Sequence, residues 1–168
     1  VVASMAATAE QAGVQIVAGD TKVVDRGSAD KIFINTAGIG VLPWNVKIGA
    51  DRARPGDAVI VSGTMGDHGM TILTQREGLQ FDSPLESDCA PLNGLVAHLL
   101  GALQGGIVHA MRDPTRGGLA TTLVELALAS NAGIEIEESA VPMRDAVRAA
   151  CELLGFDPLY VANEGKLI

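Results

Sequence analysis

The stretch Arg112-Asp113-Pro114-Thr115-Arg116-Gly117-Gly118-Leu119 decides the fold, because it joins an apolar run at 107–110 to a segment with helical spacing at 118–130. Pro114 presets one backbone dihedral of the turn, and the two glycines let backbone amides approach a ligand closely. The run before the turn predicts a strand, and the segment after it predicts a helix whose first N–H groups have no partner within the helix.

The same alternation of strands and helices continues on both sides of this turn. Short runs rich in valine and isoleucine predict strands at 14–17, 31–42, 58–62, 107–110 and 134–137, with a last strand starting at 159–162. Helical spacing predicts helices at 1–12, from the glycine-rich loop 63–69 to Gly78, from a cap at Ser87 or Asp88 to Leu103, at 118–130 and from Pro142 to Gly155. We therefore expect an α/β (α+β) protein in which helices cover a sheet.

A segment rich in turn residues interrupts this alternation. Pro43 ends the long strand pattern, and Pro55-Gly56 precedes the next buried strand. We therefore expect a linker at 43–56 that separates a first domain, 1–42, from a second, 57–168.

Composition excludes several classes of protein. The formal net charge of −8 argues against a nucleic-acid partner, because nothing neutralises a run of phosphates. No apolar run approaches the roughly 18 residues of a membrane span, and no leader pattern is present, so we expect a cytoplasmic protein without a membrane partner. Cys89 and Cys151 fall in helical patterns and are predicted to be reduced core thiols. The chain begins at Val1 without an initiator methionine, and we expect it to be a piece of a longer protein.

The turn at 112–119 is the first candidate for chemistry. Asp113 can accept from a ribose hydroxyl, Arg116 can pair with phosphate, and the helix start can bind an anion. The alternative is a capped connection in which the glycines serve packing. The arginine favours the functional reading, since a purely structural turn gains little from it.

Three further clusters are candidates. Gly19-Asp20-Thr21-Lys22 exposes a carboxylate, a hydroxyl and an ammonium within one turn, which suits a Mg²⁺–phosphate ligand, although Gly-Asp is also an ordinary turn. Ala162-Asn163-Glu164-Gly165-Lys166 offers a general base, although the segment alone is more typical of an exposed turn. Asp67 and His68, at the start of a helix, either line a pocket or form an exposed cap. No metal-binding cluster of His and Cys, no Walker A sequence and no GxGxxG are present.

Five segments in the same order resemble the HypE family of [NiFe]-hydrogenase maturation proteins, over nearly the whole chain. They are Gly19-Asp20-Thr21-Lys22-Val23-Val24, Phe33-Ile34-Asn35-Thr36-Ala37-Gly38, residues 61–69 (VSGTMGDHG), Asp113-Pro114-Thr115-Arg116-Gly117-Gly118 and Ala162-Asn163-Glu164-Gly165-Lys166-Leu167. The Gly-Asp-Thr and Asp-x-Thr-x-Gly-Gly elements are also similar to those of aminoimidazole ribonucleotide synthetase, thiamine-monophosphate kinase and selenophosphate synthetase.

The resemblance implies a PurM-like, aminoimidazole ribonucleotide synthetase-like fold of two α/β domains. Residues 1–42 would end the N-terminal nucleotide-binding and dimerisation domain, and 57–168 would form the first two-thirds of the C-terminal domain. The implied activity is an ATP- and Mg²⁺-dependent carbamoyl dehydratase, which turns an S-carbamoyl cysteine at the C-terminus into a thiocyanate, the source of the hydrogenase's cyanide ligands. The implied partners are a second copy, a HypF-type carbamoyltransferase and a HypC/HypD-type scaffold for the iron ligands.

The resemblance also implies a role for each matching residue. Lys22 and Glu164 match catalytic positions, the lysine for phosphoryl charge and the glutamate as base. Asp20, which would hold Mg²⁺, and Thr21 match the nucleotide and metal site on one side of a common triphosphate. The matching positions on the other side are Asp113, Thr115, Arg116, Gly117, Gly118 and Asn163. The family's upstream aspartate and its cysteine-bearing tail have no counterpart in the chain, so we expect the chain by itself to be inactive.

Two alternatives stay open at this point. One is another PurM-like ATP-dependent synthetase or kinase, of the aminoimidazole ribonucleotide synthetase or selenophosphate synthetase type. The other is a non-catalytic module that docks a partner and binds no nucleotide.

Overall fold

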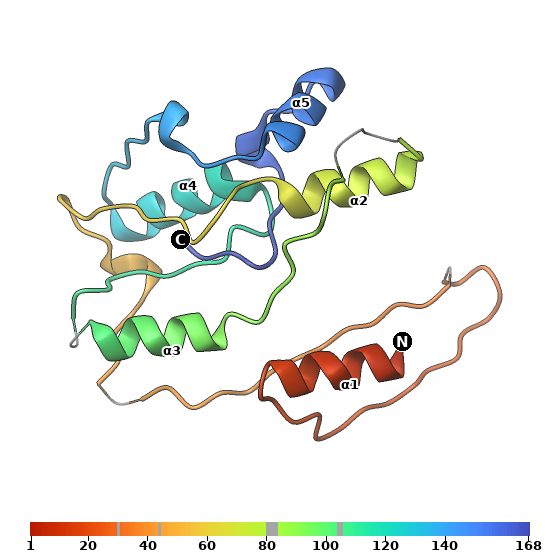
Figure 1. Cartoon of the computed structure of the whole chain (residues 1–168). Helices are drawn as coiled ribbons and strands as arrows, with labels where there is room; N and C mark the ends of the chain where they lie inside the picture. Colours follow the sequence, from red (N-terminus) through yellow and green to blue (C-terminus); the bar gives the residue numbers. More distant parts are fainter. Residues whose placement is uncertain (30, 44, 80–83, 104–105) are drawn as a thin grey trace. The chain divides into compact units, whose positions relative to one another are not determined.

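The computed structural model describes residues 1–29, 31–43, 45–79, 84–103 and 106–168. The chain divides into two compact units, Val1–Val46 and Lys47–Ile168, each described by itself (Figure 1). The boundary lies inside the segment 43–56 that the sequence predicts to be a linker, of which Trp44 is outside the described residues. The assignment of the two units to the two domains of a PurM-like protein stays a prediction.

The described residues of the first unit contain one helix followed by a long segment without regular secondary structure. Helix α1 spans Val2–Gln11, and Gly13 follows its C-cap with a φ of 63°, a left-handed conformation that glycine adopts without strain. The predicted strand at 31–42 has no strand structure: Lys31 has a φ of 61°, residues 32–42 have no regular secondary structure, and their apolar side chains are exposed, with Phe33 78% and Ile39 104% accessible. In the described part of this unit, the β-like sequence therefore forms no sheet.

The second unit also departs from the predicted strands. Among its described residues none lies in a strand, and the backbone bonds between its non-helical segments do not continue into a ladder. The Ser62 N–H donates to the Leu167 carbonyl at 3.0 Å, and Arg112 and Ile168 exchange two bonds of 2.9 Å. β-Branched residues favour extended backbone, but a ladder also needs successive pairs with a neighbouring segment. The predicted strands at 58–62, 107–110 and 134–137 are thus extended segments here.

Four helices of the second unit agree with the sequence pattern to different degrees. α4 (Gly118–Ser130) has the predicted bounds, and α2 (Asp67–Glu77) ends at Gly78, whose φ is 66°. α3 (Asn93–Ala102) begins later than its predicted cap at Ser87 or Asp88, and α5 (Asp145–Leu154) begins later than Pro142. The 3₁₀ turns are η1 (Ala50–Arg52), η2 (Glu138–Ala140) and η3 (Pro158–Tyr160), the last replacing most of the predicted strand at 159–162.

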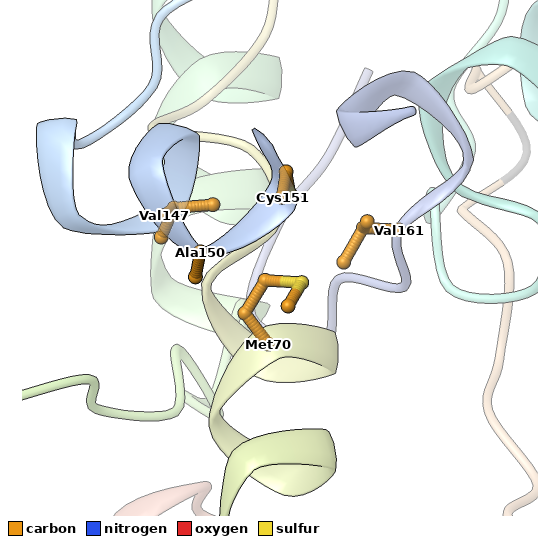
Figure 2. Packing of buried hydrophobic residues seen from close by; sticks show 5 residues of the cluster. All are labelled: Met70, Val147, Ala150, Cys151 and Val161. Atoms are coloured by element: carbon orange, nitrogen blue, oxygen red, sulfur yellow. The ribbon is translucent and has the colours of Figure 1, made fainter. Parts of the chain in front are cut away.

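Two clusters of buried side chains hold α2, α4 and α5 in place. The cluster in Figure 2 joins α2 to α5 and to the chain after η3, through Met70, Val147, Ala150, Cys151 and Val161. The second cluster joins the α2 entrance to α4 through Met65, Leu119, Leu123 and Leu126, with Leu159 packed against it. Because Leu159 and Val161 belong to different clusters, the chain that follows η3 is anchored beside both helix starts. This anchoring positions residues 162–166.

The two cysteines differ in their surroundings. Cys151 is buried in the first cluster, as predicted, and burial raises the pKa of its thiol. Cys89 contradicts the prediction of a core thiol, because it is exposed in the extended segment before α3. Both thiols are free. No helix in the described part of the chain has the length and apolar character needed to span a membrane.

Candidate functional site

The side chain of Asn163 brings three predicted motifs together in the second unit. It is fully buried, and its Oδ1 accepts from the Gly66 N–H at 2.7 Å. Its Nδ2 donates to the Pro114 carbonyl at 3.1 Å and to the Val161 carbonyl at 3.0 Å. One amide group therefore joins the start of α2, the turn before α4 and the segment that carries Glu164. Since both ends of this amide are occupied, the structure gives Asn163 a positioning role and no open face for a ligand.

The turn before α4 is built on its glycines. Gly117 and Gly118 have φ values of 69° and 64°, in the left-handed region that side chains rarely adopt. A Cβ at Gly118 would lie 2.5 Å from the Leu159 carbonyl oxygen, so no larger residue fits there. Both glycines are thus required by packing as well as by the turn. The first N–H groups of α4 have no partner within the helix, and that they bind an anion stays a prediction.

The polar side chains of this turn are accessible. Asp113 is 60% exposed, with Arg112 Nε 3.9 Å from its Oδ1. Arg112 is more closely paired with Glu125, at 2.7 Å. Arg116 is exposed and Thr115 half-buried, and Arg116 has no ion pair within the described ranges. Asp113, Thr115 and Arg116 can therefore reach a ligand without breaking an interaction of the fold.

The start of α2 separates its two predicted pocket residues. The Asp67 side chain is 1% exposed and receives a hydrogen bond from Thr64 Oγ1 at 2.5 Å and an ion pair from Arg144 Nε at 3.2 Å. The prediction that Asp67 lines a pocket is wrong for this structure, because its buried carboxylate anchors the helix. His68 remains partly accessible at 22%.

His68 faces two other segments. Its Nε2 lies 3.7 Å from Glu164 Oε1, and its Nδ1 lies 2.8 Å from Ser87 Oγ. The thiol of Cys89 is 3.7 Å from the same Nδ1. The structure thus places His68 beside the predicted base, a contact that sequence spacing alone does not reveal.

The turn that carries Glu164 is held by Asp88. The Glu164 N–H donates to Asp88 Oδ1 at 3.2 Å, and Lys166 Nζ lies 3.1 Å from Asp88 Oδ2. This second contact is an ion pair without hydrogen-bond geometry, between side chains only 12% and 3% exposed. A Cβ at Gly165 would collide with the Asp88 carbonyl oxygen. Lys166 therefore neutralises Asp88 and does not pair with Glu164, whose side chain stays 39% exposed.

The predicted residues of the first unit are all exposed. The Thr21 N–H donates to Asp20 Oδ1 at 2.8 Å, which makes a local turn. Lys22 is accessible and has no ion pair with a described residue. The described residues hold no group of three or more His, Cys, Asp or Glu side chains arranged for a metal. Asp20 thus fits Mg²⁺ only as a single carboxylate ligand, of the kind that Mg²⁺ accepts together with nucleotide phosphates.

Sequence reasoning missed Asp88, Ser87 and one pair elsewhere in the second unit. Ser87 and Asp88 were predicted as alternative helix caps, but both instead bond to distant residues. His109 Nδ1 lies 2.8 Å from Asp57 Oδ2, and this hydrogen bond lowers the pKa of Asp57. Nothing local in the sequence around His109 indicates this partner.

Comparison with known proteins agrees with the resemblance in the sequence. The family model described as AIR synthase related protein, C-terminal domain, matches residues 54–168. The carbamoyl dehydratase HypE of Azotobacter vinelandii is 55% identical over all 168 residues. The chain covers 49% of that protein, and so spans about half the length of the curated relatives it matches.

Solved structures agree with the predicted fold class. The HypE–HypF complex contains a chain that matches 99% of this one with a TM-score of 0.94 at 53% identity, over 54% of its own length. A hydrogenase maturation protein HypE in complex with ATP matches with a TM-score of 0.85 at 52% identity, over 99% of this chain and 49% of its own. The predicted resemblance to HypE and the PurM-like class are thereby confirmed. The chain belongs to the family of AIR synthase related proteins, by the C-terminal domain that covers residues 54–168.

Proposed function

We propose that the whole protein is an ATP-dependent carbamoyl dehydratase of [NiFe]-hydrogenase maturation. The names and bound nucleotide of the HypE relatives support this activity, and the five collinear motifs lie in the half of those proteins that the chain spans. The observation that carries the proposal is the set of hydrogen bonds made by the buried Asn163 side chain. It joins the turn of the predicted base Glu164 to the predicted anion-binding turn at 113–118.

The proposed reaction removes water from a carbamoyl group held as a thioester on a cysteine at the C-terminus of the whole protein. An amide oxygen leaves poorly, so the γ-phosphoryl group of ATP is first transferred to it. Loss of the remaining N–H proton then expels phosphate and forms the thiocyanate. Both steps need positive charge near phosphate and a carboxylate near the nitrogen.

The residues of the chain divide these tasks. Lys22, an exposed ammonium, stabilises the transferring phosphoryl group, and Glu164 accepts the N–H proton. The start of α4 and Arg116 bind phosphate oxygens, and Asp113 accepts from the ribose. Asp20 would hold Mg²⁺, which neutralises phosphate charge when it is bound, and Thr21 supplies a hydroxyl beside it. Thr115 and the glycines shape the turn.

Partners follow from the same proposal. The carbamoyl group must be delivered by a carbamoyltransferase of the HypF type, and the cyanide must pass to an iron-carrying acceptor of the HypC/HypD type. We also propose a homodimer. Copurification of the full-length protein with each partner, and light scattering of the protein alone, test these assignments.

Activity is tested in the full-length protein with Lys22→Ala and Glu164→Gln. Phosphate release from ATP, and the mass loss of one water from the carbamoylated cysteine, are measured together. We expect both variants to lose turnover by at least about 100-fold, while Lys47→Ala and Glu152→Gln, at exposed positions, keep the parent rate. Unchanged turnover in Glu164→Gln would remove Glu164 from the mechanism.

The products distinguish the alternatives. A phosphotransferase leaves a stable phosphorylated acceptor and causes no mass loss at cysteine. A docking module gives no heat on titration with Mg-ATP but still binds its partner. Only the dehydratase couples phosphate release to loss of water.

A further inference from the structure

His68 stands next to Glu164 for reasons that lie in the fold. The residues on either side of it are fixed, since Asp67 is anchored by Thr64 and Arg144. The Gly69 N–H donates to the Ala162 carbonyl at 3.0 Å, which sets the first turn of α2 against the segment that carries Glu164. A Cβ at Gly69 would lie 2.5 Å from Val161 Cγ1, so this approach requires glycine.

The backbone of Glu164 is fixed from the other side. Asp88 accepts its N–H, and Gly165 crosses the Asp88 carbonyl too closely to admit a side chain. The Glu164 carboxylate itself is 39% exposed and free to turn. Its Oε1 lies 3.7 Å from His68 Nε2, and a side-chain shift of less than about 1 Å would bring the two atoms to hydrogen-bond distance.

The far nitrogen of His68 leads to solvent. Nδ1 is 2.8 Å from the hydroxyl oxygen of Ser87, an exposed residue. With a proton on Nδ1 donated to Ser87, Nε2 is left as an acceptor directed at Glu164. A chain of three groups therefore runs from the Glu164 carboxylate to the surface.

We propose that His68 and Ser87 relay to solvent the proton that Glu164 removes from the substrate; this inference rests on the proposed function. Glu164 takes the N–H proton and becomes a neutral acid. It passes that proton to Nε2 of His68, while the Nδ1 proton moves to Ser87 Oγ. The Ser87 hydroxyl, which donates to Cys89 Sγ at 3.2 Å in the structure, turns to release its own proton to water. The carboxylate is regenerated without a net change in the charge of the relay.

The test uses the full-length protein and substitutions that each keep the contact of only one ring nitrogen of His68. In His68→Asn the amide can keep the Ser87 contact, and in His68→Gln it can keep the Glu164 contact, but neither group relays a proton. We expect both variants to lower kcat by about 10- to 100-fold, with the Kd of Mg-ATP by calorimetry within about twofold of the parent. His98→Asn, the same change at an exposed histidine of α3, should keep the parent kcat.

Rescue of activity by added imidazole distinguishes a proton-relay role of His68 from a purely structural one. In His68→Ala, added imidazole should restore part of kcat, whereas Glu164→Gln should gain nothing from imidazole. Parent kcat in His68→Asn, or a loss in His68→Ala that imidazole does not reduce, would overturn the relay. If His68→Asn lowers the thermal midpoint by more than a few degrees, Ser87→Ala is measured in its place. We expect Ser87→Ala to lower kcat, and a parent kcat in this variant would overturn the inference.

Failure of this inference is distinguishable from failure of the proposed function. Loss of activity in Glu164→Gln with full activity in the His68 and Ser87 variants refutes the relay alone. Full activity in Glu164→Gln refutes both.

Discussion

Gly66 and Asn163 are 97 positions apart in the chain, yet the backbone N–H of one and the side-chain Oδ1 of the other lie 2.7 Å apart. The same amide reaches Pro114, 49 positions away, with its nitrogen. The start of α2, the turn before α4 and the Glu164 turn are therefore held by a single side chain that has no exposure to solvent.

Removing this side chain should destabilise the second unit. Asn163→Ala leaves the Gly66 N–H without its partner in a buried place and removes two bonds to carbonyls. We expect a loss of about 3 kcal/mol in the free energy of unfolding, measured by urea denaturation. Asn45→Ala, at an exposed position, should change it by less than about 0.5 kcal/mol. An equal, small effect of both changes would contradict the role given to Asn163.

The close approach of the Gly165 backbone to the Asp88 carbonyl leads to a second prediction. In Gly165→Ala the new Cβ meets the carbonyl of Asp88, a backbone atom that cannot move alone. We expect a loss of about 2 kcal/mol or more in stability, together with displacement of the Glu164 turn. Gly101→Ala, in α3 with no atom within 4 Å of the new Cβ, should be neutral or stabilising by up to about 1 kcal/mol. Thermal denaturation of both variants checks the contrast, which a wild-type midpoint for Gly165→Ala would refute.

The pair Asp57–His109 should make stability depend on pH. The pKa of Asp57 is lowered, first by the hydrogen bond from His109 and then by the Arg54 N–H. A carboxylate whose folded pKa is depressed stabilises the protein above the unfolded pKa, and this contribution is lost as pH falls through the folded pKa. The stability advantage of the parent over Asp57→Asn should therefore be present at neutral pH, begin to fall near the unfolded pKa of about 4, and be lost as pH falls on through the lowered folded pKa.

Urea midpoints of the parent and of Asp57→Asn at neutral and acid pH measure this difference, and NMR titration of the Asp57 carboxyl measures the pKa directly. Asp25→Asn, at an exposed position of the first unit, is measured alongside as the control for the loss of a surface carboxylate. A difference between parent and Asp57→Asn that persists at acid pH would exclude the hydrogen bond as its cause.

The two thiols should react at very different rates. Cys89 is exposed, while Cys151 is 1% exposed and burial raises the pKa of its thiol, which lowers the thiolate fraction at neutral pH. With iodoacetamide under native conditions, peptide mass spectrometry should find Cys89 alkylated and Cys151 intact. Unfolding in urea should make both react, and Cys89→Ser should abolish the fast native reaction. Comparable native rates at the two sites would show that Cys151 is not buried in solution.

The sequence predicts the elements that local chemistry determines. The start of α4 follows from Gly117 and Gly118, and the end of α2 follows from Gly78, because left-handed backbone at these places calls for glycine. Strands could not be predicted in the same way. Residues 31–42 favour extended backbone, but a ladder depends on a neighbour that no local pattern specifies.

The same distinction between local and long-range determinants holds for the candidate site. The motifs that contain Asp113, Arg116 and Glu164 are recognisable as residues, whereas their meeting through Asn163 depends on contacts across 49 and 97 positions. Asp88 shows the limit most clearly. A carboxylate before an apolar run is a good helix cap, and it is an equally good acceptor for a distant N–H, so its bond to Glu164 could not be told from its position in the chain.

The order of synthesis gives the Asn163 contacts a further consequence. On the ribosome, residue 66 is added 97 residues before residue 163, an interval of about 10 s at about 10 residues per second. During that interval α2 and α4 can form as nascent helices, but their entrances have no Asn163 to bind. The start of α2 and the turn before α4 therefore gain their hydrogen bonds to Asn163 only after residue 163 has been synthesised. A ribosome that stalls before codon 163 leaves both segments without these bonds.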